Sequence, residues 1–198
     1  MATTQEILAI RKPESRLPLI SPILNRFSPR VFSSEQIPDE HMQIIFEAAR
    51  LAPSGRNNQP WMYFWARKGS KAYERLVDCI FERNHWCKSA PVLILSTYDP
   101  TEPVDGLNRW ATYDLGAANL SLILQAQDLG YYARQIGSFD IPKVENTFPE
   151  VEKTHKPFVI IAMGKIGNDK DYQGADIETV QKDMIPADRK TSVHKELV

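Results

Sequence analysis

Two nearly continuous apolar stretches of strand length constrain the fold of this chain more than any other feature. Residues 90–98 read APVLILSTY, and residues 156–164 read KPFVIIAMG. Successive side chains of a strand point to opposite sides of a sheet, so a strand that is apolar at nearly every position is buried on both faces. We therefore expect a sheet that is covered on both faces.

Helical patterns account for much of the remaining chain. Residues 38–52 carry apolar side chains at helical spacing, and Pro53 ends this pattern. A longer helix is expected over residues 109–129, where small residues crowd one side and Gly130 is placed to end it. Small residues let another helix approach closely, which favours a dimer.

Shorter elements complete the order. We expect a helix over residues 70–84 that Ser70 caps, and a helix over residues 140–146 that Asp140 caps. The run WMYFWA, residues 61–66, has strand character. The stretch RQIGSFD, residues 134–140, is interpreted as a turn. This order of elements indicates a single α+β sandwich.

Composition excludes several classes of function. Of 198 residues, 24 are basic and 25 acidic, so no net field favours nucleic acid or anionic membrane. The two cysteines, Cys79 and Cys87, form neither a disulfide framework nor a zinc set, and the four histidines lack metal-ligand spacing. No segment approaches the ~20 apolar residues of a membrane span. We therefore expect a cytoplasmic protein without a metal site.

Motifs of several enzyme classes are missing from the sequence. No Ser-His-Asp or Cys-His set can be recognised, because His85 and Cys87 are two residues apart in a helical pattern and point to different faces. No segment has P-loop spacing, and no GxGxxG follows a strand. A nucleotide-like cofactor would have to be held by other means.

The segment NRFSPRVF is the first candidate ligand site. Arg26, Ser28 and Arg30 alternate along it, so in an extended segment their side chains project to one side. Two guanidinium groups around a hydroxyl suit a phosphate monoester. The alternative is an exposed loop with surface arginines, and this segment alone favours that alternative.

The segment APSGRNNQPW, residues 52–61, is the second candidate. The amides of Asn57 and Gln59 each offer a donor and an acceptor, which could pair with the edge of a heterocycle. Alternatively, these amides bond the backbone of the loop itself. The spacing does not decide between the two, and Asn58 is expected to serve the turn.

Two weaker candidates lie further along the chain. Gly137 and Ser138 precede the helix capped by Asp140, and a glycine there either lets backbone N–H groups approach a ligand or supplies a positive φ. Near the C-terminus, Arg189 and Lys190 either close over a phosphate or are simply solvated.

Taken in order, these segments resemble the nitroreductase family of flavin-dependent NAD(P)H oxidoreductases, which hold FMN in a dimer interface. The resemblance covers about residues 25–198, and its most specific part is the turn APSGRNNQPW. Its other motifs are the segments RFSPRVF, NHWCKSAPVLIL, DLGAANLSLILQAQDLGYYARQIGSFD and DRKTSVHKELV.

The resemblance implies an α+β, nitroreductase-like, three-layer sandwich with a mixed, mostly antiparallel sheet, assembled as a homodimer. It implies a lead-in segment over residues 1–24, an FMN-binding domain over residues 25–167, and an extension over residues 168–198 that packs on the partner subunit.

The resemblance also assigns roles to individual residues. Arg26, Ser28 and Arg189 would hold the FMN phosphate, with Arg30 near the phosphate or the pyrimidine end. Phe27 belongs to the same cofactor-binding segment and stands where the family often has a second basic residue. The flavin ring and ribityl chain would be lined by Ser54, Asn57, Gln59 and the backbone at Ile136 and Gly137.

The implied reaction is a ping-pong transfer in which NAD(P)H reduces FMN at N5 and a second acceptor then removes the electrons. The expected acceptors are nitroaromatics, quinones or similar small electrophiles, and no side chain acts as a nucleophile. Three alternatives remain: the same fold with reductive dehalogenation or flavin breakdown, a flavin-binding protein without turnover, and a small-ligand module without flavin.

Overall fold

The computed structural model describes residues 15, 17–101, 106–152, 155–167, 189 and 193. Most of the predicted extension over residues 168–198 therefore lies outside the described residues, as do Lys190 and much of the lead-in. The elements, in chain order, are α2 (Ser21–Asn25), α3 (Asp39–Arg50), the 3-10 helix η1 (Gly55–Asn57), β1 (Trp61–Arg67), α4 (Lys71–Val77), the 3-10 helix η2 (Glu82–Ser89), β2 (Val92–Tyr98), α5 (Ala111–Asp128), β3 (Tyr132–Ile136), α6 (Ile141–Thr147), α7 (Pro149–Glu152) and β4 (Lys156–Gly164).

The four described strands form one sheet in the order β1-β2-β4-β3, and every pairing between them is antiparallel. The two apolar stretches are the central strands β2 and β4, so both are flanked by strands and covered on both faces. The outer strands, β1 and β3, form the edges. The predicted α+β sandwich is confirmed.

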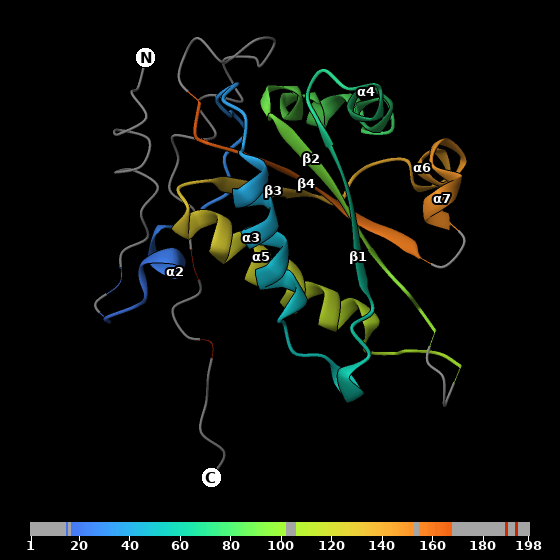
Figure 1. Cartoon of the computed structure of the whole chain (residues 1–198), viewed down its shortest axis with the longest axis horizontal. Coiled ribbons are helices and arrows are strands. Elements are labelled where there is room, and N and C mark those ends of the chain that lie inside the picture. Colours follow the sequence, from blue (N-terminus) through green and yellow to red (C-terminus); the bar gives the residue numbers. More distant parts are fainter. Residues whose placement is uncertain are drawn as a thin grey trace.

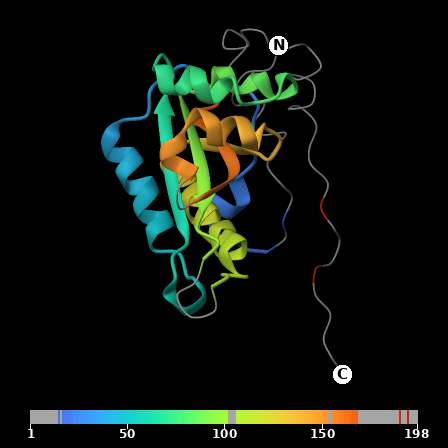
Figure 2. The same cartoon turned by 90° about the vertical axis from the view of Figure 1, so that its right-hand side faces the viewer.

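Alternating residues of β2 separate two hydrophobic cores. Val92 and Ile94 pack with α3 and α5, whereas Leu93 and Leu95 pack with α4 and η2 on the other face. All four of these side chains are essentially inaccessible to solvent. The views along and across the sheet show the resulting three layers, with α3 and α5 on one side and α4, α6 and α7 on the other (Figure 1; Figure 2).

Two predicted caps are present, and one predicted helix is divided. The Ser70 hydroxyl accepts from the backbone N–H of Tyr73, and the Asp140 carboxylate accepts from that of Lys143. The helix predicted over residues 70–84 ends at Val77 and is followed by η2. Apolar periodicity alone does not distinguish an α-helix that continues from one that is followed by a 3-10 turn.

The strand β3 corrects the interpretation of residues 134–140 as a turn. Tyr132 to Ile136 pair with β4 and form the second edge of the sheet. Gly130, at φ +82°, ends α5 and lets the chain reverse into this strand. The stretch is polar because an edge strand needs apolar side chains only where it meets the core.

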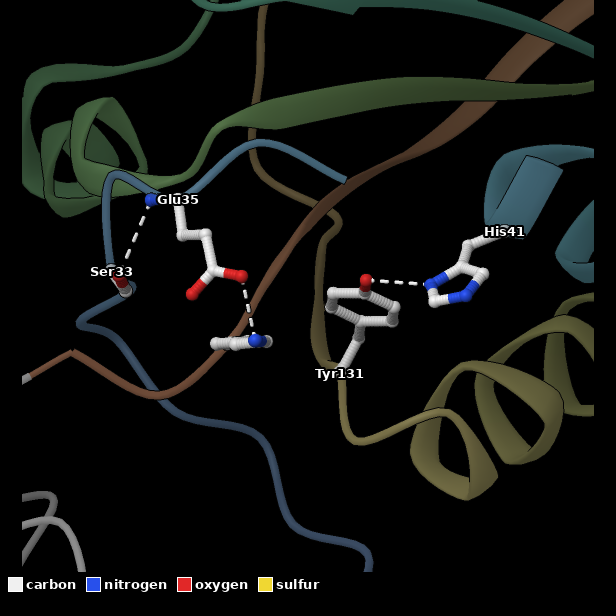
Figure 3. Close-up of polar contacts among 5 residues, drawn as sticks. Ser33, Glu35, His41 and Tyr131 are labelled. Carbon is white, nitrogen blue, oxygen red and sulfur yellow. Dashed lines mark hydrogen bonds and ion pairs between the residues drawn. The ribbon is translucent and has the colours of Figure 1, made fainter. Parts of the chain in front are cut away.

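Polar contacts join the first turn of α3, and the segment before it, to residues next to β3 and β4 (Figure 3). The His41 Nδ1 and Tyr131 Oη atoms are 2.8 Å apart, and the Lys165 ammonium donates to the Glu35 carboxylate at 2.6 Å. Ser33 is tied in through its backbone N–H, which donates to the Lys165 carbonyl at 2.9 Å. Burial raises the pKa of the Tyr131 phenol, so it stays neutral within this cluster.

Candidate functional site

The segment after α2 is extended, and its burial alternates residue by residue. Phe27 and Val31 are buried, while Arg26, Ser28 and Arg30 are partly exposed. This alternation agrees with the expectation that the three polar side chains project to one side.

Arg26 and Ser28 line a hollow of about 390 Å³ beside β3, which we call the β3-edge hollow. Two guanidinium groups, a hydroxyl and an amide surround it together with three aliphatic side chains. Its lining residues are Arg26, Ser28, Leu120, Ile123, Ala133, Arg134 and Gln135. Charged donors beside an aliphatic wall suit a ligand with an anionic end and a flat apolar body.

The electrostatics of this hollow favour an anion. The Arg26 Nη1 atom donates to the Ser28 hydroxyl at 3.5 Å. Burial, and next the positive charge of Arg189, lower the pKa of the Arg26 guanidinium. A lowered pKa means that the positive charge is less stable here than in water, and a bound anion would reverse that cost. Arg189 is thus close enough to Arg26 for their charges to interact.

Arg134 is a candidate residue that the sequence did not reveal. Its Nη1 atom donates to the Ser28 carbonyl at 2.6 Å, and its guanidinium lies 5.4 Å from the centre of the Trp86 ring. Arg134 therefore holds the segment of residues 26–30 against β3 and also contacts η2 through Trp86. Arg134 and Gln135 lie on the edge strand β3, where polar residues are common, so no local sequence signal distinguished them.

Within the segment of residues 26–30, two residues predicted to bind the cofactor, Phe27 and Arg30, lie outside the lining of this hollow. The Phe27 ring is only 6% exposed and packs against the Tyr132 ring, with 5.1 Å between their centres. Any ligand contact from Phe27 would have to come from its backbone. The Arg30 carbonyl accepts from the Ser89 hydroxyl at 3.5 Å, and Arg30 does not line the β3-edge hollow.

The end of β3 leaves room for a close backbone approach. Ile136 is buried and pairs with Ile160, and Gly137 follows it on the exposed side. Gly137 does not have a positive φ, and a Cβ added there would meet no atom within 4 Å. The alternative that this glycine supplies a positive φ is therefore excluded.

Residues 54–59, which we call the amide loop, contain a cluster of left-handed backbone. Arg56, Asn57 and Gln59 have φ values of 52°, 58° and 46°. Residues other than glycine adopt this region at a cost of about 1–2 kcal/mol, with asparagine among the more tolerant. Such strain persists only where surrounding contacts hold it in place.

Three hydrogen bonds hold the amide loop. The Ser54 hydroxyl accepts from the Gln59 N–H at 3.0 Å, and the buried Asp114 carboxylate of α5 accepts from the Gly55 N–H at 3.0 Å. The Gln59 side-chain Nε2 donates to the Asn57 carbonyl at 3.1 Å. Part of the Gln59 amide therefore serves the loop backbone, and Asn57 and Gln59 are both exposed.

The two candidate regions are separate in a single chain. Asn57 and Gln59 line a second hollow, of about 460 Å³, together with Asp99 and His155. No described residue lines both this hollow and the β3-edge hollow. The two regions are therefore two distinct hollows.

The described residues hold no group of three or more His, Cys, Asp or Glu side chains that could bind a metal ion. Within the same part of the chain, no helix is long and apolar enough to cross a membrane. Cys79 and Cys87 are both free and buried.

Solved structures define the class to which this fold belongs. A structure described as "oxidoreductase containing FMN" matches with a TM-score of 0.83 at 26% identity, covering 95% of this chain and 97% of that chain. The FMN-dependent nitroreductase of Clostridium difficile R20291 matches with a TM-score of 0.63 at 22% identity, covering 78% and 95%. The fold is therefore that of the FMN-containing α+β oxidoreductases.

Sequence comparisons agree on the family. The model of the nitroreductase family matches residues 23–85. A relative from Archaeoglobus fulgidus, described as "Putative NADH dehydrogenase/NAD(P)H nitroreductase", is 29% identical over 159 residues, which is 78% of this chain and 88% of the relative. A relative of the same description from Methanothermobacter thermautotrophicus is 26% identical over 128 residues, 64% of each chain. The predicted resemblance to the nitroreductase family is confirmed. The descriptions of the similar proteins name an NAD(P)H nitroreductase and an oxidoreductase that contains FMN.

Proposed function

We propose that this chain is an FMN-dependent NAD(P)H oxidoreductase that holds the FMN phosphate in the β3-edge hollow. The observation that carries the proposal is the Arg26 guanidinium, which is half-buried, lies beside the Ser28 hydroxyl and has a pKa lowered by burial and by Arg189. A dianionic phosphate would accept charge-assisted hydrogen bonds from these groups and relieve their electrostatic cost.

The rest of the hollow fits the remainder of FMN. The aliphatic side chains of Leu120 and Ile123 offer a wall for a flat ring, and Gly137 leaves the end of β3 open to it. When bound, FMN would supply the redox chemistry, taking electrons from NAD(P)H and passing them to a second substrate. The protein binds and orients the cofactor and tunes it with nearby donors.

We propose a homodimer that combines the two separated regions. Trp110, the N-cap of α5, and Tyr113 and Leu120 on α5 are 59%, 76% and 50% exposed, an apolar stripe at helical spacing. Such a stripe is suited to pairing with a second copy. A partner on this face could bring its amide loop, with Ser54, Asn57 and Gln59, to the flavin.

The proposal extends to substrates and surroundings. The electron acceptors are small conjugated electrophiles such as nitroaromatics and quinones, which can stack on an open flavin face. We propose that residues 168–198 pack on the partner subunit, while Arg189 itself interacts with the charge of Arg26 of its own chain. A cytoplasmic location is part of the proposal because both cysteines are free thiols.

Purification provides the test. The protein should be yellow or take up FMN, and NADH or NADPH should bleach the flavin spectrum in the absence of oxygen. Adding nitroaromatics or quinones to the reduced protein should restore the colour. A colourless protein that cannot be reconstituted with FMN would overturn the proposal, and tight FMN binding without NAD(P)H oxidation would reduce it to a binding role.

A further inference from the structure

A buried amide on the central helix connects three strands of the sheet. Asn119 of α5 is only 2% exposed, and its Oδ1 atom accepts from the Tyr63 hydroxyl of β1 at 3.0 Å and from the Ser96 hydroxyl of β2 at 2.8 Å. Its Nδ2 atom donates to the Gln135 Oε1 atom of β3 at 3.4 Å. The network thus runs under the sheet and ends at the β3-edge hollow.

The hydrogen bonds of the structure give this network a direction. Burial raises the pKa of the Tyr63 phenol, so Tyr63 remains a hydroxyl donor at neutral pH. With two hydroxyls donating to its oxygen, Asn119 has only its NH₂ group to offer to Gln135. Gln135 must then accept with its oxygen and turn its own NH₂ group away from Asn119.

We propose that Gln135 is a hydrogen-bond donor to the ligand of the β3-edge hollow and that Asn119 is the positioning residue that fixes its polarity. The inference rests on the proposed function, because it takes FMN as that ligand. It goes further because it assigns an orientation to the Gln135 side-chain amide: the NH₂ group faces the hollow, and the oxygen does not.

A fixed donor at this place has a redox consequence. Reduction adds electron density to the heteroatoms of the flavin ring, and a donor already aimed at one of them binds reduced FMN more tightly than oxidised FMN. Gln135 therefore raises the reduction potential of the cofactor. Because Asn119 is held by Tyr63 and Ser96, Gln135 need not reorient when the ligand changes charge.

A comparison of wild type with two substitutions of Gln135 provides a graded test. Equilibrium reduction with a reference dye gives the ratio of affinities for reduced and oxidised FMN. Gln135→Leu removes the donor and should lower that ratio about tenfold, which equals ~30 mV for a two-electron couple. Gln135→Glu keeps an acceptor for Asn119 but places an acceptor oxygen toward the hollow, so it should lower the ratio further. Gln36→Glu, an exposed site that makes the same charge change, should leave the ratio unchanged.

A double-mutant cycle tests the positioning role of Asn119. Asn119→Ala should lower the potential when Gln135 is present and should add no shift in the Gln135→Leu background. A purely structural role would shift the potential, or the melting temperature alone, equally in both backgrounds. If Asn119→Ala does not fold, Asn119→Ser replaces it, because its shorter side chain cannot reach Gln135.

The outcomes separate this inference from the proposed function. A wild-type protein that binds no FMN overturns both. Suppose that the wild-type protein binds FMN and is reduced by NAD(P)H, but that Gln135→Leu and Gln135→Glu both have the wild-type reduction potential. That result overturns only the donor role of Gln135. An equal Asn119→Ala shift in both backgrounds overturns only the positioning role.

Discussion

The β3-edge hollow and the amide loop hold their polar groups in different ways. In the hollow, Arg26 and Ser28 lie on an extended segment whose alternation already directs them to one side, and Arg134 fastens that segment through the Ser28 carbonyl. In the amide loop, Asn57 and Gln59 are displayed by left-handed backbone that hydrogen bonds must hold.

The two regions should therefore respond differently to the loss of one side chain. A binding site on regular extended backbone loses only the contact that is removed when one side chain is changed. A site on strained backbone also loses the shape of the loop when an anchor is removed.

The largest effect is expected from breaking the proposed dimer, which would separate the two regions. Tyr113→Glu places a charge on the exposed stripe of α5 and should raise the dimer dissociation constant by more than about 100-fold, because burying an unpaired charge is costly. Analytical ultracentrifugation measures this. Ile141→Glu on α6, in the opposite layer, is the matched control and should remain dimeric. An unchanged Tyr113→Glu dimer would mean that α5 is not the interface.

Removing the anchor of the amide loop should have the next largest effect. Asp114→Ala leaves the Gly55 N–H without its carboxylate acceptor and should lower the free energy of unfolding by about 2 kcal/mol. Hydrogen exchange should speed up more over residues 54–59 than over β3. Asp114→Asn keeps an acceptor oxygen and should lose less. Equal loss of protection in β3 would contradict the separation of the two regions.

A smaller effect separates backbone strain from ligand contact at Asn57. Asn57→Ala should destabilise the chain by about 1 kcal/mol, because alanine tolerates φ 58° poorly, whereas Asn57→Gly should not. Both changes remove the amide and should weaken FMN binding if Asn57 contacts the flavin. Thermal melts and flavin fluorescence measure the two effects. FMN binding weakened only by Asn57→Ala would assign Asn57 to the loop alone.

The smallest effect concerns the Cys87 thiol of η2 and the dependence of stability on pH. Burial raises the pKa of the Cys87 thiol to about 12, so the folded state keeps it neutral while the unfolded chain ionises it near pH ~8.5. Stability from this group is complete below that pH and is lost as the pH rises toward 12. At about pH 9 the loss should be about 0.8 kcal/mol. Denaturation of Cys87→Ala should be less sensitive to alkaline pH than that of wild type, and an identical dependence would show that Cys87 is accessible.

The central part of the fold could be predicted from the sequence because its signals are periodic. The apolar runs in β2 and β4 and the alternation around Arg26 follow directly from strand geometry. The strand β3 was missed because Arg134 and Gln135 replace apolar residues at an edge that faces a hollow. Polar composition there indicated a turn.

The amide loop marks the other limit of prediction. Its residues indicated a turn, but the consecutive left-handed conformations of Arg56 and Asn57 depend on Asp114, which lies far along the chain. The network around Asn119 was likewise hidden, because its partners come from three different strands and share no local motif. The predicted roles of the site residues toward FMN remain predictions.

The phosphate assignment of the β3-edge hollow is tested most directly by comparing FMN with riboflavin, which lacks the phosphate. Arg26→Ala should weaken FMN binding by about 10- to 100-fold, the equivalent of one charge-assisted hydrogen bond, and leave riboflavin binding within about twofold. Arg50→Ala, an exposed change of the same type on α3, is the control and should alter neither. Equal losses for FMN and riboflavin in Arg26→Ala, or no loss of FMN at all, would contradict the assignment.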